Sequence, residues 1–134
     1  MKVFPSALFF SREHTWVRID NDLAIVGITD YAQEKMEEII SIELPKEDSS
    51  VERDEPFGNI ESIKDVFEII SPITGEVVSV NEEVIDDAGI VNSDPYDTGW
   101  LIVVEMKNPE ELLDLMDAEE YGDFVAQESE VDFL

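Results

Sequence analysis

The sequence predicts a mainly β domain, built as a compact sandwich or barrel with short helices at its edge and at its C-terminus. Three observations support this class: the β-prone segments are short, turn residues separate them closely, and helix-start signals gather after residue 107. The 134 residues, 43% of them hydrophobic, suffice for one packed core. We therefore expect a single domain over residues 1–126 and an acidic, frayed tail over residues 127–134.

The expected elements follow from β-branched and aromatic residues, turn residues and helix caps. Thr29 and Asp30 can cap a helix with one apolar side, and Pro45 ends a strand. The expected strands are 15–19, 23–28, 39–44, 57–63, 66–70, 76–80 and 100–106; the expected helices are 31–38, one that begins at Asn108-Pro109 and one that begins at Asp117-Ala118 and runs toward Phe124; residues 46–54 and 81–98 are expected as turns and loops.

The chain is very acidic, with 34 Asp and Glu against 8 Lys and Arg and a net charge of -26. Phosphate backbones and anionic membranes would be repelled, which disfavours nucleic-acid and membrane-surface functions. The acidity indicates either partners with basic patches or a role in solubility alone. The apolar runs are too short to span a bilayer, and the start lacks the pattern of a signal or transit peptide. We expect a cytoplasmic protein of a bacterium or archaeon rather than a mature mitochondrial one.

Catalytic groups are scarce. Without cysteine, the chain has no disulfide, thiolate nucleophile or cysteine metal site, so any sulfur chemistry must come from a cofactor. The single histidine, His14, is expected to be structural or at the surface. No phosphate-binding glycine motif or H-E-x-x-H pattern is present, and the many carboxylates single out no catalytic pair or metal cluster. We expect a protein that is not an enzyme.

Lys64 stands between two β-prone segments, so it should lie at or near the tip of a hairpin. Phe57-Gly58 precede it, and Ser71-Pro72 follow, which gives the order strand, lysine turn, strand, proline turn. A lysine on a rigid two-stranded projection is accessible to an acylating enzyme. The alternative is a lysine that only adds solubility to a turn.

Nine sequence stretches, in order and with similar spacing, resemble the H protein of the glycine cleavage system over residues 10–125. These stretches are EHTWV (13–17), VGITDYAQ (26–33), IELP (42–45), PFG (56–58), ESIK (61–64), SPITGEV (71–77), VNSDPY (91–96), GWLI (99–102) and AEEY (118–121). The resemblance implies a hybrid barrel-sandwich fold related to lipoyl and biotinyl domains, with short added helices.

The resemblance also implies roles for individual residues. Lys64 aligns with the lysine that carries lipoate in amide linkage. Glu61 matches an acidic position associated with recognition by the attaching enzyme. Glu68 matches an acidic position that contacts the amine of the loaded arm in a surface cleft, and Glu13 and Asp30 are further candidates for that contact.

By the same resemblance, the chain is the lipoyl-bearing shuttle of glycine cleavage. It would carry an aminomethyl group from a pyridoxal-phosphate glycine decarboxylase to a folate-dependent aminomethyltransferase. A dihydrolipoyl dehydrogenase would reoxidise the arm, and a lipoyl transferase or ligase would attach it. A shuttle that offers one arm to several partners is expected to be a monomer.

Some residues depart from the family pattern. Thr15 replaces a common glutamate, Phe67 replaces a small polar residue, and family glycines are replaced near Glu37 and at Asp54. Thr15 and Phe67 motivate a first alternative, an H-like paralogue in lipoate relay or a lipoyl carrier in sulfur oxidation. A second alternative is an unmodified acidic interaction module, and a third is a true enzyme.

Overall fold

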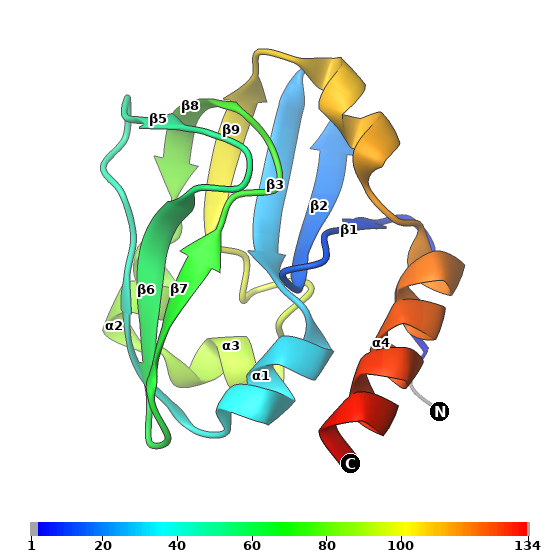
Figure 1. Cartoon of the computed structure of the whole chain (residues 1–134). Helices are drawn as coiled ribbons and strands as arrows, with labels where there is room; N and C mark the ends of the chain where they lie inside the picture. Colours follow the sequence, from blue (N-terminus) through cyan, green and yellow to red (C-terminus); the bar gives the residue numbers. More distant parts are fainter. Residues whose placement is uncertain (1–2, 134) are drawn as a thin grey trace.

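The computed structural model describes residues 3–133, with side chains up to residue 128, as two antiparallel sheets and several short helices (Figure 1). The larger sheet has the order β1 (Phe9–Phe10), β2 (Thr15–Asp20), β3 (Leu23–Ile28), β9 (Ile102–Met106), β8 (Gly75–Val80) and β5 (Ser50–Val51). The smaller sheet has the order β4 (Ile39–Glu43), β6 (Pro56–Ser62) and β7 (Val66–Ile70). The helices are α1 (Asp30–Met36), α2 (Glu82–Asp86), α3 (Gly89–Ser93), the 3-10 helix η1 (Pro109–Asp114) and α4 (Ala118–Phe133). The mainly β prediction is confirmed.

One hydrophobic core joins the two sheets. Val17 and Val26 of the larger sheet share this cluster with Ile42 and Ile60 of the smaller one. Strand residues point alternately to opposite faces, and β2 nevertheless buries Thr15, Trp16 and Val17 in succession. This is possible because the other face of β2 is covered as well.

A second hydrophobic cluster lies on that other face and attaches α4 to the sheet. It contains Phe10, Trp16, Tyr121 and Val125. The ring of Phe10 stacks on that of Tyr121, with centroids 4.6 Å apart. The C-terminal helix is therefore an integral part of the domain, and it runs beside β1 and β2 (Figure 1).

The hairpin of β6 and β7 ends at residues 63–65, beside α1 (Figure 1). Its register pairs Glu61 with Val66 and Ile60 with Phe67. Strand β7 lies at the edge of the smaller sheet, so one side of it is free of strand neighbours. This arrangement confirms the expected hairpin around Lys64.

The segment 81–98 differs from the loop that the sequence predicts, since it contains α2 and α3. The Asn81 side chain accepts a hydrogen bond of 3.1 Å from the backbone of Glu83 and so caps α2. Val84 and Val91 anchor the two helices in the core. Helices of five residues are too short to show a 3.6-residue period, and nearby turn residues mask them further. The two-residue strands β1 and β5 escaped prediction for the same reason.

The helices after residue 107 are only partly as predicted. The helix at Pro109 is a 3-10 helix, and Asn108 makes no side-chain cap bond. The second prediction is confirmed by a reciprocal capping box, in which the Asp117 amide donates to Glu120 at 3.0 Å and the Glu120 amide donates to Asp117 at 2.8 Å.

Helix α4 is longer than expected and continues to Phe133, because Tyr121 and Val125 bury one side of it. It thus includes residues 127–133 of the tail, whose fraying stays a prediction, and residue 134 lies outside the described residues. None of the helices in the described part of the chain is long and apolar enough to cross a membrane.

Candidate functional site

Lys64 lies in the turn at the tip of the β6–β7 hairpin. Its side chain is 58% exposed, and its Nζ atom lies 3.6 Å from Oε2 of Glu37, which follows α1. An ion pair this exposed is worth at most about 1 kcal/mol, so it does not sequester the amine. Lys64 is therefore accessible to a modifying enzyme.

Hydrogen bonds from Ser62 shape the turn around Lys64. The Ser62 hydroxyl accepts from the backbone amides of Lys64 at 3.1 Å and Asp65 at 3.3 Å, and the Ser62 amide donates to the Asp65 carbonyl at 2.9 Å. The Ile63 amide donates to the Glu38 carbonyl at 2.9 Å and so attaches the tip to the end of α1. The backbone at Lys64 is thus fixed while its side chain remains exposed.

A cleft of about 240 Å³ adjoins the hairpin. Its lining residues come from the loop before β2, from α1, from β7 and from α4: Glu13, His14, Tyr31, Ala32, Lys35, Met36, Phe67, Glu68 and Glu128. Phe67 is three residues beyond Lys64, or about 10 Å along a strand. Met36 immediately precedes Glu37, the ion-pair partner of Lys64. Lys64 is therefore outside the cleft lining, and its ion-pair partner directly follows the cleft residue Met36.

His14 lies in the wall of this cleft with both ring nitrogens bonded. Nδ1 lies 2.7 Å from the Tyr121 hydroxyl, and Nε2 lies 2.8 Å from Oε2 of Glu128. Burial lowers the pKa of His14 below its ordinary value, although the neighbouring Glu128 and Glu13 oppose this effect. His14 is therefore neutral at pH 7, and its expected structural role stays a prediction.

Tyr31, a residue of the cleft lining, carries a buried polar atom without a partner among the described residues. The residue is only 6% exposed, and this atom is its hydroxyl oxygen. A buried hydroxyl left unpaired costs about 1–3 kcal/mol. The cleft combines apolar side chains, those of Tyr31, Met36 and Phe67, with charged ones, which fits a flexible arm with an apolar chain and a polar end.

The predicted acidic residues fall in different places. Glu68 and Glu13 line the cleft, and Glu68 also borders a hollow of about 320 Å³ that is lined by residues 43–45 and 56–59. Glu61 is exposed on β6 and accepts a bond of 3.0 Å from the Ser41 hydroxyl. Asp30 is not among the described residues of the cleft lining, and its carboxylate accepts from the Gln33 side chain at 2.7 Å.

Thr15, one of the departures from the family pattern, does not face the cleft. It is 1% exposed, and its hydroxyl lies 2.6 Å from that of Ser11. Phe67, another departure, is a cleft residue. Of these two departures, only Phe67 lines the cleft.

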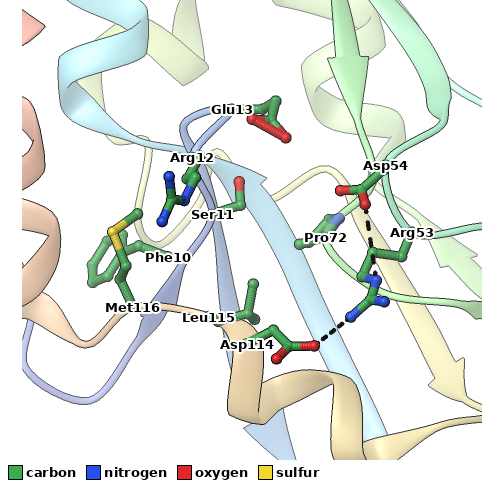
Figure 2. A pocket seen from close by; sticks show the side chains of 10 residues that line it. All are labelled: Phe10, Ser11, Arg12, Glu13, Arg53, Asp54, Pro72, Asp114, Leu115 and Met116. Carbon is green, nitrogen blue, oxygen red and sulfur yellow. Dashed lines mark hydrogen bonds and ion pairs between the residues drawn. The ribbon is translucent and has the colours of Figure 1, made fainter.

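Glu13 also lines a second pocket, of about 260 Å³ (Figure 2). Arg53 spans part of it, with Nη1 donating to Asp114 at 2.7 Å and Nε lying 4.0 Å from Asp54. The hydrogen bond to Asp114 raises the pKa of Arg53. The lining contains no residue of the β6–β7 hairpin, so this pocket is not continuous with Lys64.

Sequence reasoning missed Lys35 and Glu128 in the cleft, and it missed the contact of Glu37 with Lys64. Lys35 lies on the expected helix and could have been placed on one face with Tyr31 by the i, i+4 spacing. Glu128 had no such signal, because it belongs to the segment expected as a frayed tail.

Comparison with known proteins decides the family. The family model described as "Glycine cleavage H-protein" matches residues 8–128. The chain belongs to this family. The H protein of Halalkalibacterium halodurans is 43% identical, with 96% of this chain and 100% of that protein covered, and the H protein of Brevibacillus brevis is 45% identical over 92% and 98%. A crystal structure of an H protein from Mycobacterium marinum aligns with a TM-score of 0.83 at 28% identity, covering 94% of this chain and 99% of that one.

Membership in the H-protein family confirms the predicted resemblance and the hybrid barrel-sandwich fold. An H protein is a carrier component of a multienzyme system rather than a catalytic enzyme, which confirms the expectation drawn from the scarcity of catalytic groups. The family carries lipoate and works with the other enzymes of glycine cleavage.

Proposed function

We propose that Lys64 carries the lipoyl group and that the chain shuttles an aminomethyl group between enzymes of glycine cleavage. The proposed donor is a pyridoxal-phosphate glycine decarboxylase, and the proposed acceptor is a folate-dependent aminomethyltransferase. A dihydrolipoyl dehydrogenase and a lipoyl transferase or ligase are the further partners. When bound, the lipoyl group supplies the sulfur chemistry that a chain without cysteine lacks.

The exposed amine of Lys64 on a fixed hairpin tip, next to a cleft, supports this proposal most directly. The Ser62 hydrogen bonds present the amine for acylation without a large rearrangement of the backbone. Tyr31, Met36 and Phe67 would pack along the arm, and Glu13 and Glu68 would face its charged end. Glu61, exposed three residues before Lys64, is available to an attaching enzyme.

Intact mass tests the attachment. The chain from a host competent in lipoylation is expected to show one lipoyl increment, and peptide mapping should assign it to Lys64. Lys64→Arg should abolish the increment, and Lys107→Arg, a matched change at an exposed lysine just after β9, should retain it. A chain without the increment would instead be the unmodified interaction module.

Reconstitution tests the pathway. The lipoylated chain, a glycine decarboxylase and glycine should yield the aminomethyl-loaded form by mass. Full lipoylation without loading from glycine would favour the alternative, a carrier in lipoate relay or in sulfur oxidation. The observation behind this alternative is Phe67, whose large ring stands in the cleft.

A further inference from the structure

A chain of hydrogen bonds links the start of α1 to the cleft. The Ala32 amide donates to Thr29 Oγ1 at 3.2 Å, and Thr29 Oγ1 lies 2.7 Å from the Tyr121 hydroxyl. The Tyr121 hydroxyl lies 2.7 Å from His14 Nδ1, and His14 Nε2 lies 2.8 Å from Glu128. The bonds connect α1, α4 and the loop before β2 in one series.

The Glu128 carboxylate determines which atom donates and which accepts in each of these hydrogen bonds. An ionised carboxylate can only accept, so His14 Nε2 carries the proton and donates. Because His14 is neutral, its Nδ1 must accept, and the single proton of the Tyr121 hydroxyl is donated to it. Burial raises the pKa of Tyr121, which keeps that proton in place. The Tyr121 oxygen then accepts from the Thr29 hydroxyl.

This series holds Glu128 at the cleft without neutralising it. A neutral histidine orients the carboxylate but adds no positive charge, and the bond to Oε2 leaves acceptor capacity on Oε1. Glu128 is only 36% exposed in its side chain, so its charge is partly shielded from solvent. The cleft lining contains one lysine, Lys35, and three carboxylates, those of Glu128, Glu13 and Glu68.

We propose that Glu128, positioned by the Thr29–Tyr121–His14 series, contributes to the charge specificity of the cleft together with Glu13 and Glu68 and favours an arm that ends in an ammonium group. The proposal rests on the proposed attachment of the arm at Lys64. In this proposal, α4 supplies one of the three carboxylates that line the cleft. Glu128 is a specificity-determining residue, and His14 and Tyr121 are positioning residues.

An arm with a defined charge tests the proposal. Because the chain has no cysteine, the reduced lipoyl arm carries its only thiols. Alkylation with 2-bromoethylamine gives the arm cationic ends, and alkylation with iodoethane gives it neutral ends of similar length. The docked fraction is measured from the NMR shift of the ¹³C-labelled methyl group of Met36, which lines the cleft.

The cationic arm is expected to dock more strongly than the neutral arm in the unmutated chain. Glu128→Gln should weaken docking of the cationic arm by about 2- to 5-fold, the range for a partly exposed ion pair, and leave the neutral arm unchanged. Glu119→Gln makes the same charge change at an exposed position of α4, and it should affect neither arm. Tyr121→Phe should weaken the cationic arm in the same direction as Glu128→Gln.

Equal docking of the two arms in the unmutated chain, or an equal effect of Glu128→Gln on both arms, would overturn the proposal. A chain that lacks the lipoyl increment refutes the proposed function and this inference together, and the mass shows this before alkylation. A lipoylated chain without charge selectivity refutes this inference alone.

Discussion

The hydroxyl of Tyr121 lies 2.7 Å from Nδ1 of His14, so the last helix is bonded to a loop 107 residues earlier in the chain. The same hydroxyl lies 2.7 Å from Oγ1 of Thr29. Tyr121→Phe would leave buried polar atoms of both neighbours unpaired. We expect it to lower the free energy of unfolding by about 1–3 kcal/mol, measured by urea denaturation.

Tyr31→Phe is the matched control, since it makes the same chemical change at another buried tyrosine. The Tyr31 hydroxyl has no partner among the described residues, so its removal relieves a desolvation penalty instead of breaking a bond. Its free energy of unfolding should be equal to that of the unmutated chain or higher by about 1 kcal/mol. Equal losses in the two variants would contradict the assigned hydrogen bonds.

The pH dependence of stability should report on His14. Burial lowers the pKa of His14 in the folded chain below the ordinary value of 6.5. The charges of Glu128 and Glu13 raise this pKa, and the charge of Lys35 lowers it further. The tyrosines Tyr31 and Tyr121 also adjoin the ring. The unfolded chain therefore binds the proton more readily. Neutral His14 therefore makes its full contribution to the free energy of unfolding above pH 6.5. This contribution is lost as the pH falls through 6.5 toward the pKa of His14 in the folded chain.

His14→Gln isolates this contribution, because the two proteins share every carboxylate. The difference in free energy of unfolding between the unmutated chain and the variant should be smaller at about pH 5.5 than at about pH 7.5. A difference that grows on acidification would mean that Glu128 raises the pKa of His14 by more than burial lowers it.

The parts of the site that the sequence predicted are those encoded locally. Turn residues between alternating strands placed Lys64 at a hairpin tip, and the same pattern placed Glu68 on β7. The cleft is different, because its walls meet only through tertiary packing. Glu128 reaches it because Tyr121 and Val125 attach α4 to the second buried face of β2.

Glu37 is expected to be a strained position. Its φ of 65° and ψ of -146° fall in a region that is almost exclusive to glycine. Glu37→Gly should raise the free energy of unfolding by about 1 kcal/mol, after loss of the weak ion pair with Lys64. Glu37→Ala removes the same ion pair without relieving the strain, so it should give no gain.

Asp54→Gly provides the comparison at a second position with positive φ, 71°. Aspartate tolerates the left-handed region better than glutamate, so the gain should be smaller than at Glu37. Thermal and urea unfolding of the three variants would measure this order. A larger gain at Asp54 would show that the Glu37 backbone is not strained by its side chain.

Phe67 should act on the arm through apolar contact instead of charge. It lines the cleft from the edge strand β7, and its ring provides part of the apolar wall. Phe67→Ser removes an apolar contact worth about 1 kcal/mol, so docking of the cationic and neutral arms should weaken alike, roughly 5-fold, by the Met36 methyl measurement. Val66→Ser, at the exposed neighbouring position, should leave both unchanged. Stronger docking in Phe67→Ser would instead mean that the ring obstructs the cleft, and would favour the carrier role outside glycine cleavage.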